Sequence, residues 1–92
     1  MTRVRTHPGE ILAKEYLEPL DMSARALAEE ISVPANRVSD IVRGRRGVTA
    51  DTALRLARYF RTDPRFWLNL QAAHDLSVAK AETDYSKLPE YA

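Results

Sequence analysis

The chain has 92 residues, enough for one domain and too few for two hydrophobic cores, and its 45% hydrophobic and 29% charged residues are typical of a soluble globular protein. It contains no cysteine, which excludes disulfides and thiolate metal sites, and no segment approaches the roughly 18 apolar residues of a membrane span. The polar start lacks the apolar region of a signal peptide, so we expect a cytoplasmic protein.

A first helix is predicted after a short basic lead, residues 1–6, which we expect to be mobile. Pro8 suits a first helical position because it has no N–H to satisfy, and the Glu10 carboxylate suits the positive end of the helix dipole. Pro19 ends the helix because proline breaks the helical hydrogen-bond pattern. The residues expected to form its buried stripe are Ile11, Leu12, Tyr16 and Leu17.

The pattern of residues 23–46 predicts two short helices joined by a tight turn. The Ser23 hydroxyl can cap the free amides of a first turn, and Pro34 suits the first position of the second helix. Only Ser32 and Val33 remain between the helices, so their axes must cross steeply, as in a helix-turn-helix. The apolar residues at helical spacing on the two sides of the turn are Leu27, Ile31, Val38, Ile41 and Val42.

The second helix of this pair leaves one face outside the core, and that face suits a DNA major groove. Asparagine can contact adenine through both amide groups, and arginine can contact guanine with two donors. Two roles stay open for Asp40, which could accept from a cytosine amino group or hold Arg37 or Arg43 in place. The residues predicted to contact bases are Ala35, Asn36, Arg37, Ser39 and Asp40.

Basic residues gather at the end of this helix, although the whole chain has a net charge of only +1. Four arginines stand against one aspartate over residues 37–46, so the positive charge is concentrated rather than spread. A solvated loop is the simpler explanation of such a cluster, but its position beside the second helix favours contacts with DNA phosphates. The arginines predicted to make them are Arg43, Arg45 and Arg46.

Two further helices complete the predicted bundle. Thr49 is a good N-cap, with Asp51 in the first turn, for a fourth helix that ends at Phe60. Residues 62–64 repeat a cap-then-proline signal and begin a fifth helix, which runs to residue 79 or beyond. The core residues expected on the fourth helix are Ala53, Leu54, Leu56, Ala57 and Phe60.

The fifth helix carries more apolar residues than one buried face requires, which suggests a second buried surface. A two-fold dimer is the simplest use of it, because two recognition helices about 34 Å apart read the half-sites of a palindrome. In the alternative, Trp67 simply fills the core of its own domain. The residues predicted at the dimer interface are Phe66, Trp67 and Leu70.

We therefore expect one DNA-binding domain with a dimerising last helix, residues 1–79, and a short C-terminal tail, residues 80–92. The apolar tail residues Tyr85, Leu88 and Tyr91 could dock on a neighbour.

Catalysis is the competing class of function. His7 with Glu10 and His74 with Asp75 are the only pairs that suggest a metal or acid–base site. The sequence has no HExxH motif, nucleophile elbow, phosphate loop or carboxylate pair. We therefore expect no enzyme activity, no metal and no cofactor.

Several motifs resemble a known family. The spacing within residues 23–44 resembles the Cro/C1-type (XRE) helix-turn-helix family, through Ser23, Leu27, Ala28, Val33, Val38, Ser39, Ile41 and Gly44. Longer blocks resemble the HigA-type antitoxins of that family: HPGEIL at residues 7–12, ALRLA at 53–57 and FWLNLQ at 66–71. The resemblance covers residues 7–76 and implies an all-α, five-helix, lambda repressor-like bundle.

This resemblance also implies a function. HigA-type proteins are dimeric antitoxins of type II toxin–antitoxin modules, which bind palindromic operator DNA, repress their own operon and neutralise a HigB-like toxin, an mRNA-cleaving ribonuclease. In this family hydroxyls at the positions of Ser23 and Thr49 contact phosphates as well as capping helices, so both join the predicted phosphate contacts. The alternative is a stand-alone Cro/C1-type repressor without a toxin. A module that binds only the toxin is the third class, and the arginine cluster argues against it.

Three residues depart from the family pattern. Ser32 stands where a turn glycine is usual, often at positive φ, which costs a non-glycine residue about 1 kcal/mol. Pro34 replaces a common serine or threonine cap, and Ala24 replaces a glutamine that contacts DNA in many relatives. We expect DNA binding to survive these changes and the preferred sequence to differ from that of any relative.

Overall fold

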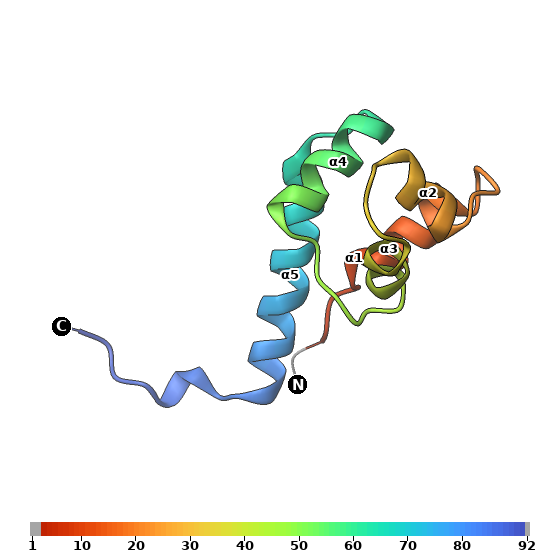
Figure 1. Ribbon diagram of the computed structural model, residues 1–92. Coiled ribbons are helices and arrows are strands. Elements are labelled where there is room, and N and C mark those ends of the chain that lie inside the picture. Colours follow the sequence, from red (N-terminus) through yellow and green to blue (C-terminus); the bar gives the residue numbers. More distant parts are fainter. Residues whose placement is uncertain (1–2, 92) are drawn as a thin grey trace.

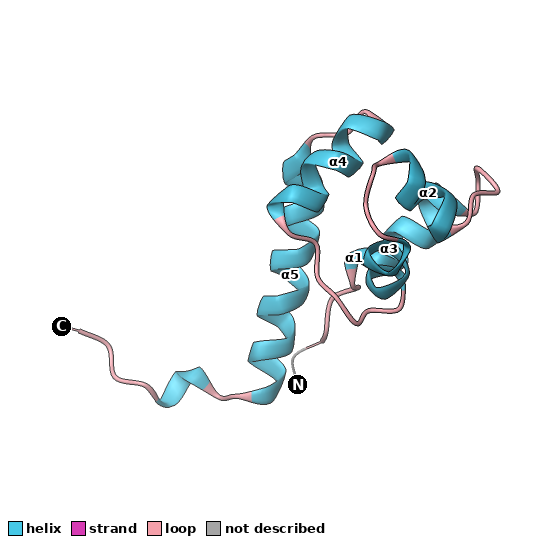
Figure 2. Ribbon diagram, in the orientation of Figure 1, coloured by secondary structure: helices cyan, strands magenta, loops and turns pink. Residues whose placement is uncertain are grey.

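The computed structural model describes residues 3–91, and all regular structure in that part of the chain is helical (Figure 1, Figure 2). Residues 1–2 and 92, the outer ends of the predicted lead and tail, lie outside the described residues. The elements are α1 (Pro8–Ile11), its π-helical continuation η1 (Leu12–Leu17), α2 (Ala24–Glu30), α3 (Ala35–Val42), α4 (Ala50–Phe60), α5 (Pro64–Glu82) and a 3-10 turn, η2 (Tyr85–Lys87). With α1 and η1 taken as one helix, the predicted five-helix bundle is confirmed. Among the described helices none is long and apolar enough to cross a membrane.

Side-chain caps begin the helices at the predicted positions. The Ser23 hydroxyl accepts from the Ala26 amide at 3.0 Å, and the Thr49 hydroxyl accepts from the Thr52 amide at 3.4 Å. Asp63 caps α5 by accepting from the Arg65 amide at 2.8 Å, with Pro64 at the first helical position. Pro34 is the N-cap of α3 rather than its first helical residue, so the helix begins one residue later than predicted.

Trp67 lies at the centre of the core and is fully buried. Its ring packs against Tyr16 and Phe66, with centroid distances of 5.1 and 5.0 Å, and its indole N–H donates to the Thr62 hydroxyl at 2.8 Å. This hydrogen bond satisfies the polar atom of a buried aromatic residue, which would otherwise cost free energy. The other apolar residues buried in the core cluster are Leu12, Leu17, Leu27, Ala28, Ile31, Val38, Ile41, Val48, Ala53 and Leu56.

One residue predicted for the core face of the fourth helix is wrong. Leu54 is 60% exposed, whereas Ala53, Leu56 and Ala57 on the same helix are buried. Successive helical residues are rotated by about 100°, so Leu54 points away from the stripe that its neighbours form. Phe60 at the end of α4 is half-buried and packs against the core.

The lead before α1 is held against α5 rather than free. The Arg5 amide donates to the Ser77 hydroxyl at 2.7 Å, and the His74 ring donates through Nδ1 to the Arg5 carbonyl at 2.7 Å. The prediction of a mobile lead is therefore wrong at Arg5, because side chains of α5 bind both backbone groups of this residue. By contrast, the tail after α5 extends away from the bundle (Figure 1) and its Tyr91 is 98% exposed.

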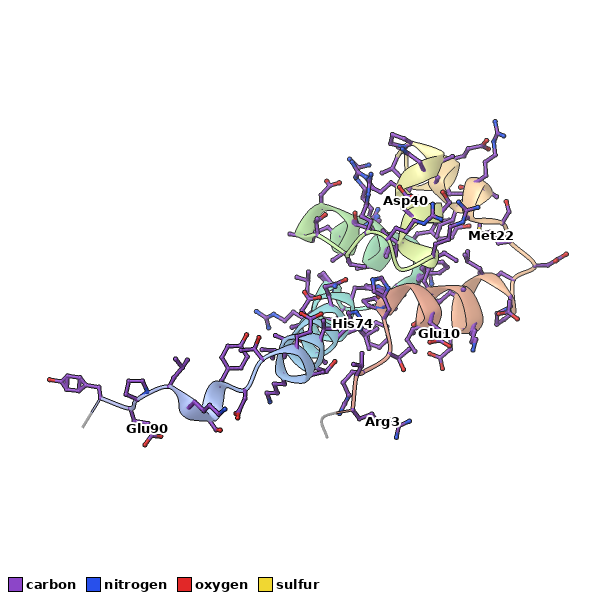
Figure 3. All side chains as sticks on the ribbon, turned by 90° about the horizontal axis from the view of Figure 1, so that it is seen from below. Arg3, Glu10, Met22, Asp40, His74 and Glu90 are labelled. Atoms are coloured by element: carbon purple, nitrogen blue, oxygen red, sulfur yellow. The ribbon has the colours of Figure 1, made fainter. Side chains whose placement is uncertain are left out.

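The segment His7 to Glu10 joins α1 to α3 and α5. His7 accepts from the Gly9 amide through Nδ1 at 2.9 Å and so caps α1. Its ring packs edge to face on that of His74, with centroids 4.9 Å apart, and His74 on α5 lies beside the first helix in Figure 3. Gly9 lies against the end of α3, where a Cβ atom would be 1.7 Å from the Ile41 carbonyl oxygen. Only glycine allows the first turn of α1 to approach the backbone of α3 this closely.

We predict that Gly9→Ala lowers the free energy of unfolding by about 3 kcal/mol, because the added methyl group forces α1 and α3 apart. On helix propensity alone the change would stabilise a helix by about 1 kcal/mol. A fall in the free energy of unfolding would therefore indicate the steric clash and not the effect of propensity. Gly47→Ala is the matched control, since the atoms nearest its Cβ would be side-chain atoms of Gln71, at 3.1 Å, and not backbone. Urea unfolding would measure both variants. An equal or smaller loss for Gly9→Ala than for Gly47→Ala would contradict this account.

A second prediction concerns pH. Burial, followed by the neighbouring His74, lowers the pKa of His7 below 6.5, while Asp75 opposes the shift. As the pH falls through 6.5, the unfolded chain therefore takes up a proton at His7 before the folded chain does. We expect the contribution of His7 to the free energy of unfolding to be complete above this pH. It should decline as the pH falls, until the lowered pKa of folded His7 has been passed. His7→Asn keeps a capping side chain without a titrating group, so its melting temperature should fall less than that of the parent between about pH 7.5 and about pH 5.5. Parallel declines would show that His7 is not the cause.

Candidate nucleic-acid interface

The helix-turn-helix is formed by α2, the turn at residues 31–34 and α3. Ser32 has φ of 60°, the left-handed conformation predicted from its place in the turn. The Val33 amide donates to the Ala28 carbonyl at 3.0 Å, which closes the turn on the end of α2. Leu27 of α2 is fully buried together with Ile41 of α3, so the opposite face of α3 remains outside the core.

That outer face of α3 carries the residues predicted to contact bases. Ala35 and Asn36 are exposed, while Arg37, Ser39 and Asp40 are half-buried. The Ser39 hydroxyl donates to the Asn36 carbonyl at 3.4 Å, within the helix itself. These five residues therefore lie on one element, although their exposure differs.

Asp40 pairs with an arginine of the loop that follows α3. Its carboxylate lies 3.8 Å from Arg46 Nη2, and its carbonyl accepts from the Arg45 and Arg46 amides at 2.8 and 3.2 Å. Of the two predicted roles, holding an arginine thus has support in the structure, but the partner is Arg46 and not Arg37 or Arg43. The pair also draws the loop back onto the last turn of α3.

Of the five residues predicted to contact phosphates, two, Arg46 and Thr49, line a groove beside α3. Arg43, Arg45 and Arg46 are exposed, as are the helix-capping residues Ser23 and Thr49. A groove of about 490 Å³ lies between α3 and the start of α4, lined by Arg37, Arg46, Gly47, Thr49, Asp51 and Thr52. Two guanidinium groups, a hydroxyl and a helix N-terminus are the groups that proteins use for DNA phosphates.

Gln71 holds the arginine loop to α5. Its Oε1 accepts from the Val48 amide at 2.7 Å, and its Nε2 donates to Asp75 at 2.9 Å. The loop backbone at Val48 is buried, so this hydrogen bond satisfies a group that would otherwise lack a partner. The FWLNLQ block therefore supplies two structural functions, the core residue Trp67 and the loop anchor Gln71.

Sequence reasoning did not identify two residues of this interface, Asp51 and Arg55. Arg37 donates through Nη1 to the Asp51 carboxylate at 2.7 Å, and Arg55 donates through Nε to the same oxygen at 3.0 Å. Hydrogen bonds from Arg55 and, after it, from Arg37 hold the pKa of Asp51 below its ordinary value, although desolvation opposes the shift. The spacing of four residues between Asp51 and Arg55 was a signal for a helical ion pair, but the contact with Arg37 has no local signal.

The predicted dimer residues differ in how much surface they can offer. Trp67 is fully buried within its own chain, which favours the alternative that it fills the domain core. Phe66 and Leu70 are half-buried and pack against that core. Further along α5, Leu76 is 60% exposed.

The histidines form no metal site with the acids considered above. Within residues 3–91 there is no group of three or more histidine, aspartate or glutamate side chains arranged to hold a metal ion. His7 and His74 instead pack on each other and hold backbone groups.

A helix-turn-helix with an exposed second helix, followed by a basic loop and a capped helix, defines a DNA-binding protein of the helix-turn-helix class. The helix-turn-helix family model matches residues 14–67. Virulence-associated protein I of Dichelobacter nodosus is 55% identical over 83% of this chain and 70% of its own length.

Solved structures agree with this assignment. The Pseudomonas aeruginosa antitoxin HigA, solved with the higBA promoter, is 43% identical, with a TM-score of 0.88 over 95% of this chain and 98% of that one. An addiction module antidote protein of the HigA family from Coxiella burnetii is 46% identical, with a TM-score of 0.86 over 97% of this chain and 100% of that one. This chain belongs to the HigA family of helix-turn-helix proteins. That family consists of DNA-binding regulators and antitoxins and not of enzymes, as we expected.

Proposed function

We propose that this protein is the antitoxin of a type II toxin–antitoxin module, and that it binds the promoter DNA of its own operon and represses transcription. The observation that carries the proposal is the exposed face of α3, which lies beside the arginine loop and the capped start of α4. The similar Pseudomonas aeruginosa HigA, solved with promoter DNA, supports it. A protein with this function acts in the cytoplasm.

In this proposal the two groups of residues have separate tasks. The residues of α3 read bases in the major groove: Ala35, Asn36, Arg37, Ser39 and Asp40. The loop arginines and the two caps bind phosphates: Ser23, Arg43, Arg45, Arg46 and Thr49. Base contacts determine which sequence is preferred, whereas phosphate contacts fix position and add affinity for any sequence.

The second ligand is a HigB-like ribonuclease toxin, which the antitoxin neutralises. The names of the antitoxin and antidote relatives support this part of the proposal. The alternative is a stand-alone repressor, and relatives described only as transcriptional regulators are consistent with it. A small basic reading frame beside this gene, whose product copurifies with the antitoxin, would decide for the toxin–antitoxin module.

We also propose that the protein binds a palindromic operator as a homodimer formed through α5. The second half of α5 projects beyond the bundle (Figure 1), and Leu76 there is 60% exposed. Phe66 and Leu70 keep part of their surface for such a contact, whereas Trp67 acts by fixing α5 on the core. A two-fold pair of α3 helices would match the symmetry of a palindrome.

Binding of the purified protein to its promoter and to random duplex, across a salt series, tests the proposed DNA-binding function. We expect tight, salt-dependent binding that prefers the promoter.

Arg37→Ala should lose about 1–3 kcal/mol of preference at one base pair, because a base contact is removed. Arg45→Ala should weaken binding to both duplexes alike and reduce the salt slope by about 1, because a phosphate contact is removed. Equal losses on promoter and random DNA for Arg37→Ala would rule out its base-reading role.

Analytical ultracentrifugation tests the dimer. We expect a dimer at micromolar concentration and at least about a tenfold weaker self-association for Leu76→Glu, because a carboxylate would be buried at the interface. Leu20→Glu is the matched control, since Leu20 is 58% exposed but belongs to the loop after the first helix, on the side of the bundle away from α5 (Figure 1). If the Leu76 and Leu20 variants dimerise equally well, the exposed part of α5 is not the interface.

A further inference from the structure

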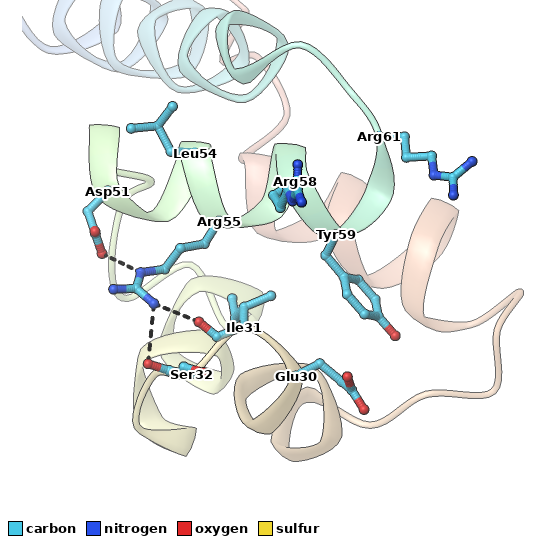
Figure 4. A pocket seen from close by; sticks show the side chains of 9 residues that line it. All are labelled: Glu30, Ile31, Ser32, Asp51, Leu54, Arg55, Arg58, Tyr59 and Arg61. Atoms are coloured by element: carbon cyan, nitrogen blue, oxygen red, sulfur yellow. Dashed lines mark hydrogen bonds and ion pairs between the residues drawn. The ribbon is translucent and has the colours of Figure 1, made fainter.

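A chain of three charged side chains connects the helix-turn-helix to α4. Arg55 donates through Nη1 to the Ile31 carbonyl at 2.8 Å and to the Ser32 carbonyl at 3.4 Å. The same guanidinium holds Asp51 through Nε, as the dashed lines in Figure 4 show. Asp51 in turn accepts from Arg37 on α3. The turn, α4 and the outer face of α3 are thus linked through one carboxylate.

Stability alone does not account for this network. The side chains of Arg37, Asp51 and Arg55 are 29%, 57% and 39% exposed. Ion pairs this exposed contribute little to the free energy of unfolding, because water screens them and ordering two long side chains costs entropy. The ion pairs matter more for side-chain orientation than for the free energy of unfolding, since both arginine partners of Asp51 are held at hydrogen-bond distance.

The contact leaves Arg37 able to reach a base. Asp51 engages Nη1, and a guanidinium group has five N–H donors in a fixed planar fork. Nε and Nη2 lie on the other edges of that fork and can still donate to a base. Holding an arginine in one orientation before binding removes part of the entropy cost of ordering it at the interface.

We propose that Asp51 is a specificity-determining residue that acts by positioning Arg37 for base reading, with Arg55 fixing Asp51 in turn. This inference rests on the proposed DNA-binding function. Asp51 contacts the base-reading side chain and not the base. Its negative charge also repels phosphates, so it reduces affinity for DNA of any sequence.

Two effects of opposite sign are therefore expected from Asp51→Asn. Affinity for random duplex should stay equal or rise by a few-fold, because a charge near phosphates is removed. Preference for the promoter should fall by about fivefold to tenfold, concentrated at the base pair that Arg37 reads. A merely structural role would lower binding to both duplexes together.

The experiment compares wild type, Asp51→Asn and Asp51→Glu on promoter DNA, on its single base-pair variants and on random duplex. Asp51→Glu keeps the carboxylate and should retain most of the preference. Asp51→Ser is a second neutral variant, also a good residue for a first helical turn, should asparagine disturb α4. Glu30→Gln is the matched control. Glu30 lies on α2 and lines a second groove, of about 840 Å³, which also contains Asp51 and Arg55 but not Arg37 (Figure 4). The promoter preference of this variant should equal that of wild type.

The double variant Arg37→Ala with Asp51→Asn completes a thermodynamic cycle. If Asp51 acts through Arg37, Asp51→Asn causes no further loss of preference once Arg37 is alanine. The inference is overturned if Asp51→Asn keeps the promoter preference of wild type. It is also overturned if Asp51→Asn lowers the preference by the same factor whether residue 37 is arginine or alanine. If the wild-type protein itself does not prefer its promoter, the proposed function fails and this inference fails with it.

Discussion

The close approach of Gly9 to the Ile41 carbonyl is the constraint on which the position of the recognition helix depends. A Cβ at residue 9 would lie 1.7 Å from that oxygen, so the first turn of α1 and the last turn of α3 can meet only without a side chain between them. The same segment is held on α5, because His7 packs on His74 and the Arg5 backbone bonds to Ser77 and His74. The end of α3 is thereby fixed relative to α1 and α5 together.

A second set of contacts fixes the other side of the helix-turn-helix. Arg55 satisfies carbonyl groups at Ile31 and Ser32, where α2 ends and the backbone turns through a left-handed conformation at Ser32. Carbonyl groups at a helix end lack intrahelical partners, and a guanidinium donor is a favourable one. Because Arg55 also holds Asp51, the turn geometry and the orientation of Arg37 depend on the same residue of α4. A rigid frame of this kind is what precise base reading requires.

The sequence was sufficient for what local chemistry determines. Capping side chains precede helices at Ser23, Thr49 and Asp63, because each satisfies amides within three residues of itself. An apolar side chain alone did not predict which residues of α4 are buried. Leu54 belongs to an apolar run, but its position around the helix axis directs it to solvent. The partner of Arg37 could not be predicted either, because Asp51 lies fourteen residues away on another helix and is brought close only by the fold.

The two acidic residues beside the basic face share one kind of contact, an ion pair with an arginine. Each pairs with an arginine assigned to DNA, Asp40 with Arg46 and Asp51 with Arg37. Both acids lower the attraction for phosphates, which acts on every sequence alike, and in our proposal Asp51 also holds the one arginine, Arg37, whose orientation matters for base reading. A repressor must find one site among a large excess of other DNA, so the ratio of specific to non-specific affinity matters more than affinity itself. Carboxylates on a DNA-binding face weaken total binding, but they raise that ratio wherever the orientation of an arginine decides which base is read.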